Sequence, residues 1–158
     1  MRILGVDPGL TVTGFCILDT NKKKINLVAY GTIKSKSNES MPQRLKYLFL
    51  EIKKIINDFK PDVLAIEDAF FSKNVKSAMV LGHARGAIIL AAAINNMNVS
   101  EYAPRKVKLS VCGTGAASKE QVSYMVSKIL NLKSELKPHD ISDSIAVGLC
   151  YINQEKLK

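Results

Sequence analysis

The order of strand-like and helix-like segments constrains the fold of this chain more than any other feature of its sequence. The chain opens with three strand-like segments joined by short polar turns, at residues 2–6, 12–18 and 25–33. Such short connections predict an antiparallel meander. Helical and strand-like segments then alternate, and this alternation predicts parallel strands joined by helical crossovers. The sequence therefore predicts a mixed α/β sheet with helices on its faces.

The remaining segments follow each other without a linker or a repeat. Apolar residues between positions 45 and 59 recur three and four apart, which is the spacing of a helix with one buried face. Ser40-Met41-Pro42-Gln43 in front of it has the pattern of a capping box. We expect the later elements to be a buried strand at 63–66, an Ala- and Gly-rich helix at 75–95, a strand at 99–102, a basic loop at 105–117, a helix that opens with a second capping box at Ser118, and a final helix at 140–152. At 158 residues, the chain is predicted to form one domain over residues 1–158.

The chain is strongly basic. It has 23 lysines and arginines against 14 acidic residues, which gives a net charge of +9. A basic balance of this size is common in proteins that bind nucleic acid. On charge alone, however, a basic soluble protein without such a partner remains an equal alternative.

Several features indicate a protein of the cytoplasm. The three cysteines, Cys16, Cys112 and Cys150, are far apart and never form a CxxC pair, so the sequence predicts neither disulfides nor a zinc ribbon. The first residues lack the zones of a signal peptide. The longest apolar run, at residues 87–94, is shorter than the roughly 20 residues that a membrane span needs. We therefore expect a soluble cytoplasmic protein without a membrane partner.

Four acidic residues stand where strands end or a helix begins. Asp7 closes the first strand and Glu67 closes the fourth. If these strands are parallel neighbours, both carboxylates leave the same end of the sheet, where open α/β sheets place their sites. Asp140 and Asp143 are three apart at a helix start and so share one face. Taken singly, each acid is better explained as a solvated strand end or a helix cap.

Taken together, the four acids favour a metal site. Hard oxygen ligands without a histidine or cysteine cluster suit Mg²⁺, with Mn²⁺ as a substitute, rather than zinc. Two such ions about 4 Å apart activate water and stabilise the leaving oxygen of a phosphodiester. We therefore predict that Asp7, Glu67, Asp140 and Asp143 are metal-binding and catalytic, with two ions in the site. His139, next to Asp140, either contacts a metal-bound water from a second shell or lies on the surface.

Basic and aromatic residues surround these acids in the sequence. Arg105, Lys108 and Lys119 flank a Gly-Thr-Gly turn that leads into a helix, a combination that can bind phosphate, although a solvated loop is as good an interpretation. Phe70 and Phe71 follow Glu67 and precede Lys73 and Lys76, and aromatics beside lysines can stack on unpaired bases. Core packing of one of these aromatics is the alternative. We predict DNA contacts for Phe70, Lys73, Lys76, Arg105, Lys108 and Lys119.

Five segments of the chain resemble the RuvC family of bacterial Holliday junction resolvases. They are GVDPGLTVTGF at 5–15, AIEDAFFSKN at 65–74, LGHARG at 81–86, VKLSVCGTGAASKEQV at 107–122 and HDISDSIAV at 139–147. They cover nearly the whole chain in the family's order. The resemblance implies a ribonuclease H-like fold, with a mixed five-stranded sheet of three antiparallel and then two parallel strands and helices on both faces.

The resemblance also implies an activity. Members of this family are homodimers that nick two opposing strands of a four-way DNA junction with magnesium, and that work with the branch-migration proteins RuvA and RuvB in recombination and repair. By motif, the ligands are Asp7, Glu67 and the Asp140 and Asp143 pair, and Asp140 is preferred to His139 because its spacing of three to Asp143 fits. The resemblance further implies base stacking by Phe70, and contacts near the scissile phosphate by Lys108 and Lys119.

Three other functions are compatible with parts of the sequence. DPGLTVTG resembles the phosphate hairpin of actin-like and sugar-kinase ATPases, but those proteins need a second domain and a second hairpin. A nuclease of the YqgF type, which acts in RNA maturation on a related fold, is a nearer alternative. A non-catalytic junction-binding protein is the third, and the presence of all four acids weighs against it.

Overall fold

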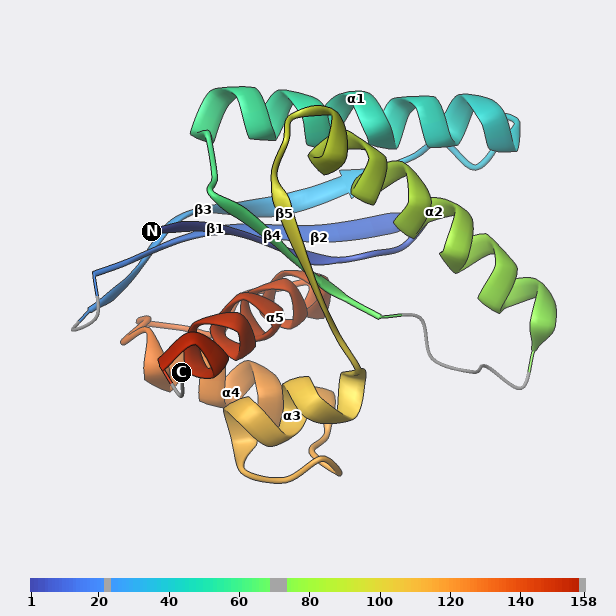
Figure 1. Ribbon diagram of the computed structural model, residues 1–158. Helices are drawn as coiled ribbons and strands as arrows, with labels where there is room; N and C mark the ends of the chain where they lie inside the picture. Colours follow the sequence, from blue (N-terminus) through green and yellow to red (C-terminus); the bar gives the residue numbers. More distant parts are fainter. Residues whose placement is uncertain (22–23, 69–73, 157–158) are drawn as a thin grey trace.

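The computed structural model describes residues 1–21, 24–68 and 74–156 (Figure 1). Its five strands form one sheet in the order β3-β2-β1-β4-β5. Their bounds are β1 Arg2–Asp7, β2 Val12–Thr20, β3 Ile25–Lys34, β4 Val63–Glu67 and β5 Asn98–Tyr102. The first three strands pair antiparallel, while β4 runs parallel to β1 and β5 runs parallel to β4. The predicted mixed sheet is confirmed.

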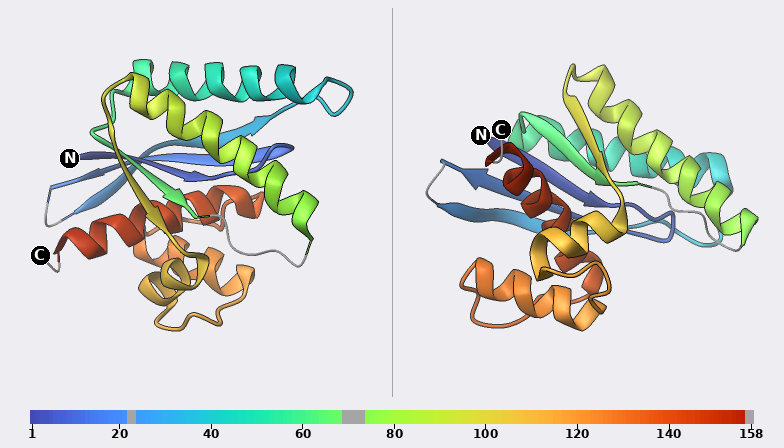
Figure 2. Two further views of the ribbon diagram at one scale, coloured as in Figure 1. Left: turned by 45° about the vertical axis from the view of Figure 1, so that its right-hand side comes forward. Right: turned by 60° about the horizontal axis from the view of Figure 1, so that its bottom comes forward.

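Helices cover both faces of the sheet, as predicted (Figures 1 and 2). One layer contains α1 Met41–Phe59 and α2 Val75–Ile94, and the other contains α3 Pro104–Cys112, α4 Lys119–Ile129 and α5 His139–Lys156. The final helix α5 lies directly on β1 and β2. It therefore runs along the centre of the sheet, and its first turn lies near the carboxyl end of β1.

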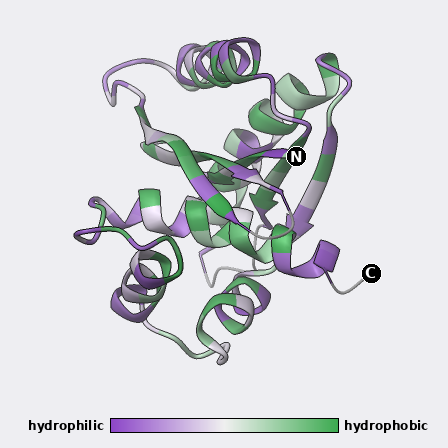
Figure 3. Cartoon of the chain, turned by 90° about the vertical axis from the view of Figure 1, so that its left-hand side faces the viewer, coloured by the Kyte–Doolittle hydropathy of each residue, from purple (hydrophilic) through white to green (hydrophobic). Residues whose placement is uncertain are grey.

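The alternation of side chains along the central strands creates two cores. Ile3, Cys16 and Leu18 face α5, whereas Leu4 and Ile17 face α1 and α2. Figure 3 shows hydrophobic residues concentrated on the strands between the helical layers, while α1, seen end-on at the top, carries both colours. A strand that is apolar at every position is therefore buried on both faces, as expected for β4.

Two local predictions were wrong. The predicted basic loop at 105–117 contains the helix α3, which starts with Pro104 in its first turn and buries Val107 and Val111, four residues apart. Gly113, with a φ of 75°, then ends the helix. Ser40 precedes α1 as expected, but its side chain makes no capping hydrogen bond. The second capping box, between Ser118 and Gln121, is confirmed.

The helix α2 is apolar but only partly buried. By length and composition alone it could cross a membrane. One side of it is packed in the protein core, through Ala84, Ile88, Ala91 and Ala92. The other side is exposed in the described part of the chain. The predicted absence of a membrane partner remains a prediction.

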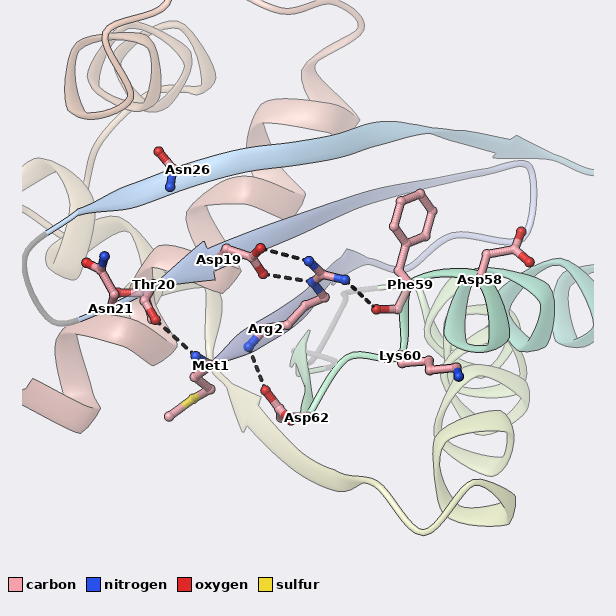
Figure 4. Close-up of a pocket in the computed structure, with 10 residues that line it drawn as sticks. All are labelled: Met1, Arg2, Asp19, Thr20, Asn21, Asn26, Asp58, Phe59, Lys60 and Asp62. Carbon is pink, nitrogen blue, oxygen red and sulfur yellow. Dashed lines mark hydrogen bonds and ion pairs between the residues drawn. The ribbon is translucent and has the colours of Figure 1, made fainter.

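A polar cavity of about 750 Å³ lies at the amino end of β1 (Figure 4). Arg2 contacts two of its acidic residues, Asp19 and Asp62. The Arg2 guanidinium donates two hydrogen bonds of 2.8 Å to the Asp19 carboxylate and one of 2.8 Å to the backbone carbonyl of Phe59. The backbone N–H of Arg2 donates to Asp62. These bonds tie β1 to β2 and to the end of α1, so we interpret this cluster as structural.

Candidate active site

Three of the four predicted acids line one cavity. Asp7 is the last residue of β1 and Glu67 the last of β4, and the parallel register pairs Val6 with Ile66, the residues just before them. Asp143 reaches the same place from the start of α5. The three carboxylates line a cavity of about 240 Å³ together with Lys108 from α3 and Lys119 from α4. The structure thus brings together these three of the four predicted acids.

The electrostatics of this cavity are unfavourable for its carboxylates. Burial, followed by repulsion from Glu67, Asp143 and Asp140, raises the pKa of Asp7 to about 8, although Lys119 opposes the shift. Burial and the charge of Asp143 raise the pKa of Glu67 to about 7, against a side-chain hydrogen bond with Asp7 and the charges of Lys108 and Lys119. Without a cation, the site therefore favours retaining a proton near neutral pH.

Asp143 has the same tendency. Burial raises its pKa, and the repulsion by Asp140 adds to this, while Lys119, His139 and Lys108 lower it. His139 is thus close enough to act on Asp143. Its Nδ1 atom is buried and has no hydrogen-bond partner in the described part of the chain. This placement favours the prediction of a supporting role over the alternative of a surface histidine.

Asp140 lies at the border of the cavity. It lines a neighbouring cavity of about 540 Å³, formed by residues 8–12 after β1 together with Lys76, Ser77, Val80 and Leu81 of α2. Its charge nevertheless raises the pKa of both Asp7 and Asp143. Asp140 therefore stands between the acidic cavity and a groove beside α2.

The turn after Asp7 is held by a buried threonine. The Thr13 hydroxyl donates a hydrogen bond of 2.6 Å to the backbone carbonyl of Gly9 and accepts one of 3.2 Å from its N–H. Thr13 is fully buried. The connection between β1 and β2 is thereby closed tightly, which fixes the direction in which the chain leaves Asp7.

Arg85 is a residue of this site that the sequence analysis missed. Its side chain is only 12% exposed, and its Nε donates a hydrogen bond of 3.0 Å to the backbone carbonyl of Glu67. The same guanidinium contacts the carboxylates of Asp68, at 3.2 Å, and Glu101. The available signal was an arginine inside an otherwise apolar helix, since such a residue is rarely buried without partners.

The predicted DNA-binding residues are divided among three places. Lys108 and Lys119 line the acidic cavity, and Lys76 lines the groove beside α2. Arg105 is exposed at the start of α3, with its side chain against Gly115. Phe70 and Lys73 lie outside the described residues. Their role stays a prediction.

The acidic cavity fits a divalent cation by its chemistry. Its ligand candidates are carboxylate oxygens, which suit magnesium or manganese. Burial, with repulsion from neighbouring carboxylates, raises the pKa values of Asp7 and Glu67, and a bound cation would offset that repulsion. Among residues 1–21, 24–68 and 74–156, no three acidic, histidine or cysteine residues already stand close enough to hold an ion. Binding would therefore have to draw the carboxylates together.

A sheet of this order, with carboxylates at the shared end of β1 and β4, is the arrangement of ribonuclease H-like nucleases. Comparison with known proteins specifies the family. The family model described as "Crossover junction endodeoxyribonuclease RuvC" matches residues 3–151. A crossover junction endodeoxyribonuclease RuvC from Alkaliphilus metalliredigens is 43% identical over 151 residues, covering 96% of this chain and 92% of that protein. This chain belongs to the RuvC family of crossover junction endodeoxyribonucleases.

Solved structures agree with this assignment. The structure of Thermus thermophilus RuvC matches with a TM-score of 0.91 and 29% identity, covering 99% of this chain and 96% of that one. Thermus thermophilus RuvC in complex with a Holliday junction substrate matches with a TM-score of 0.90 and 26% identity over the same shares. These matches do not favour the alternative of an RNA-processing nuclease.

Proposed function

We propose that this protein resolves four-way DNA junctions by metal-dependent hydrolysis of two opposing strands, in recombination and repair. The observation that carries the proposal is the cavity in which Asp7, Glu67 and Asp143 meet with raised pKa values beside Lys108 and Lys119. Membership of the RuvC family supports the substrate, since a relative of the same fold is known in complex with a Holliday junction.

The residues of the cavity have separable roles in this proposal. Asp7, Glu67 and Asp143 hold the cations, and Asp140 joins them from the border. Two Mg²⁺ ions, or Mn²⁺ in their place, supply activation of water and stabilisation of the leaving oxygen when bound. Lys108 and Lys119 contact the phosphate that is cut and offset its charge. We keep for His139, in the first turn of α5, the supporting role of contacting a metal-bound water from a second shell.

The basic side chains around the cavity indicate the path of the DNA. Lys76 in the groove beside α2 and Arg105 at the start of α3 contact phosphates on either side of the cut. Phe70 and Lys73, in the segment that joins β4 to α2, act at the crossover, with Phe70 stacking on an unpaired base. This last assignment rests on the sequence alone. Both residues lie outside the described part of the chain.

A second copy of the chain covers the exposed side of α2 in the active form. This side carries large apolar residues at a helical spacing, Val75, Met79, Leu90 and Ile94, each between 53% and 71% exposed. Gly82 and Gly86 lie between them, and a Cβ on either glycine would meet no atom within 4 Å. Glycines at the centre of an apolar stripe allow two helices to approach closely. Symmetric nicking of two strands requires two active sites, which a homodimer provides.

The remaining proposals come from the family resemblance. We place the single domain of residues 1–158 in the cytoplasm, where its DNA substrate is, with RuvA and RuvB as partner proteins.

The experiment that tests the proposed function uses the purified full chain and three labelled substrates of equal length. These are a four-way junction, a linear duplex and a single-stranded RNA, each incubated with Mg²⁺ or with a chelator. We expect paired nicks at symmetric positions in the junction with Mg²⁺ alone. Cutting of the RNA with the junction left intact would instead assign the chain to RNA processing, and binding of the junction without cutting would make it a non-catalytic binding protein.

A further inference from the structure

The first turn of α5 touches the sheet through a glycine. In the antiparallel pair of β1 and β2, Gly14 lies directly opposite Asp7. Opposite residues of such a pair project from the same face of the sheet. A side chain at position 14 would therefore stand beside the Asp7 carboxylate, on the face covered by α5. Glycine leaves this place free.

The backbone of α5 occupies the free place. A Cβ built on Gly14 would overlap the backbone carbonyl of Asp140 and come within 3.0 Å of the Asp140 Cβ. One turn further along α5, a Cβ on Gly5 would overlap the backbone carbonyl of Ser144. The helix therefore lies against β1 and β2 with backbone contacts at Asp140 and Ser144, on both sides of Asp143. Any residue with a side chain at position 14 would push the first turn of α5 away from the sheet.

We propose that Gly14 is a positioning residue of the active site. Because it has no side chain, the first turn of α5 comes close enough to β2 to bring Asp140 and Asp143 beside Asp7. This inference rests on the proposed function, and it adds a residue that neither binds metal nor touches DNA in that proposal.

A larger distance between the first turn of α5 and the sheet should affect metal binding more than folding. Outer residues that orient metal ligands commonly change metal affinity or activity by roughly 10- to 100-fold when they are altered. We expect Gly14→Ala to raise the Mg²⁺ concentration for half-maximal junction cutting by roughly tenfold or more. Binding of the junction in a chelator should stay unchanged, because Lys76, Arg105, Lys108 and Lys119 are retained.

The matched control is a second glycine to alanine change in contact with the same helix. A Cβ on Gly148, in α5, would lie 2.8 Å from Cδ1 at the tip of the Leu18 side chain, which can move aside, and in ordinary contact with the Cys16 Sγ at 3.7 Å. Gly148→Ala should therefore leave the Mg²⁺ dependence of cutting unchanged. Thermal melting of both variants reports whether each one is folded at the temperature of the assay.

Gly5→Ala keeps the test decisive if Gly14→Ala does not fold. It raises α5 at Ser144, next to Asp143, and should shift the Mg²⁺ dependence in the same direction by a smaller factor. A folded Gly14→Ala with the Mg²⁺ dependence of the wild type would overturn the proposal, as would an unshifted Gly5→Ala if only that variant folds. Failure of the proposed function looks different, since the wild type itself would then not cut junctions.

Discussion

The guanidinium of Arg85 in α2 holds the backbone carbonyl of Glu67 at the end of β4, with an Nε to oxygen distance of 3.0 Å. The same group contacts Asp68 and Glu101, so one buried cation joins the ends of β4 and β5 to α2. Glu67 is a proposed metal ligand, and α2 carries the proposed dimer surface. The position of a ligand is thereby linked to the helix on which the second copy would pack.

Replacing Arg85 should slow cutting more than it weakens DNA binding. In Arg85→Ala the carbonyl of Glu67 and two carboxylates lose their shared donor, so the end of β4 loses its fixed position. We expect junction cutting to fall by roughly 10- to 100-fold with junction affinity in a chelator nearly unchanged. Single-turnover cutting and gel-shift binding measure the two effects separately.

Arg2→Ala is the matched control. Arg2 also donates hydrogen bonds to a carboxylate and to a backbone carbonyl, but it lies at the opposite end of the sheet. It should lower the melting temperature and leave the cutting rate of the folded protein as in the wild type. Equal loss of cutting in both variants would show that Arg85 matters only for general stability.

The raised pKa of Asp7 predicts how the stability of the metal-free protein depends on pH. The pKa of this carboxyl rises from an ordinary value near 4 to about 8 on folding, so the folded state binds more protons than the unfolded state. Its contribution to the free energy of unfolding therefore falls as pH rises from about 4 to about 8. In a chelator, Asp7→Asn should therefore be more stable than the wild type at pH 8, and the difference should shrink toward pH 4. Urea unfolding at several pH values measures it.

Asp19→Asn provides a control of opposite sign. The hydrogen bonds from Arg2 lower the pKa of Asp19, so this carboxyl contributes stability above its ordinary pKa and loses it as pH falls. Asp19→Asn should be less stable than the wild type at pH 8, with the difference disappearing in acid. For Asp7 the contradicting result is the reverse trend. The free energy of unfolding of the wild type would then rise relative to that of Asp7→Asn as pH rises.

Protons and metal should compete for the same carboxylates. Binding of a cation requires deprotonated Asp7 and Glu67, whose pKa values are about 8 and about 7 in the metal-free site. The Mg²⁺ concentration for half-maximal cutting should therefore fall as pH rises from 6 to 8.5. An Mg²⁺ requirement that does not change over this range would mean that these two acids are not the ligands.

A charge on the exposed face of α2 should separate the two copies. Leu90 is 53% exposed on the apolar stripe of α2, and Leu50 is 47% exposed on α1. We expect Leu90→Glu to be monomeric by sedimentation at micromolar concentration, whereas Leu50→Glu stays dimeric. The monomer should lose the paired symmetric nicks first, because the two cuts need two linked sites. Dimers in both variants would place the interface elsewhere.

The sequence predicts the sheet and the convergence of the acids well, for a physical reason. Asp7 and Glu67 end strands whose apolar runs fix their positions in the sheet, and parallel neighbours end on the same side. The approach of Asp143 depends on a helix start that Pro138 and the apolar pattern of α5 also indicate. These are short-range patterns, and the residues that make them are close in the sequence.

Other features depend on contacts between distant residues, which a pattern does not contain. Arg85 finds its partners on two strands, 18 and 16 residues away, and nothing in LGHARG specifies them. The contact between Gly14 and Asp140 joins positions more than a hundred residues apart. The helix α3 was missed because its lysines and the following Gly-Thr-Gly turn resemble a basic loop, while its buried stripe consists of only Val107 and Val111. Such features follow from packing rather than from local propensity.

Junction cutting by Asp7→Asn tests most directly the proposal that the acidic cavity performs the hydrolysis. This variant removes one ligand charge at the end of β1 and leaves every lysine and arginine of the DNA surface in place. We expect it to bind a labelled four-way junction like the wild type and to cut it at least roughly 100-fold more slowly with Mg²⁺. Cutting at the wild-type rate, with symmetric nicks and the same Mg²⁺ requirement, would contradict the account.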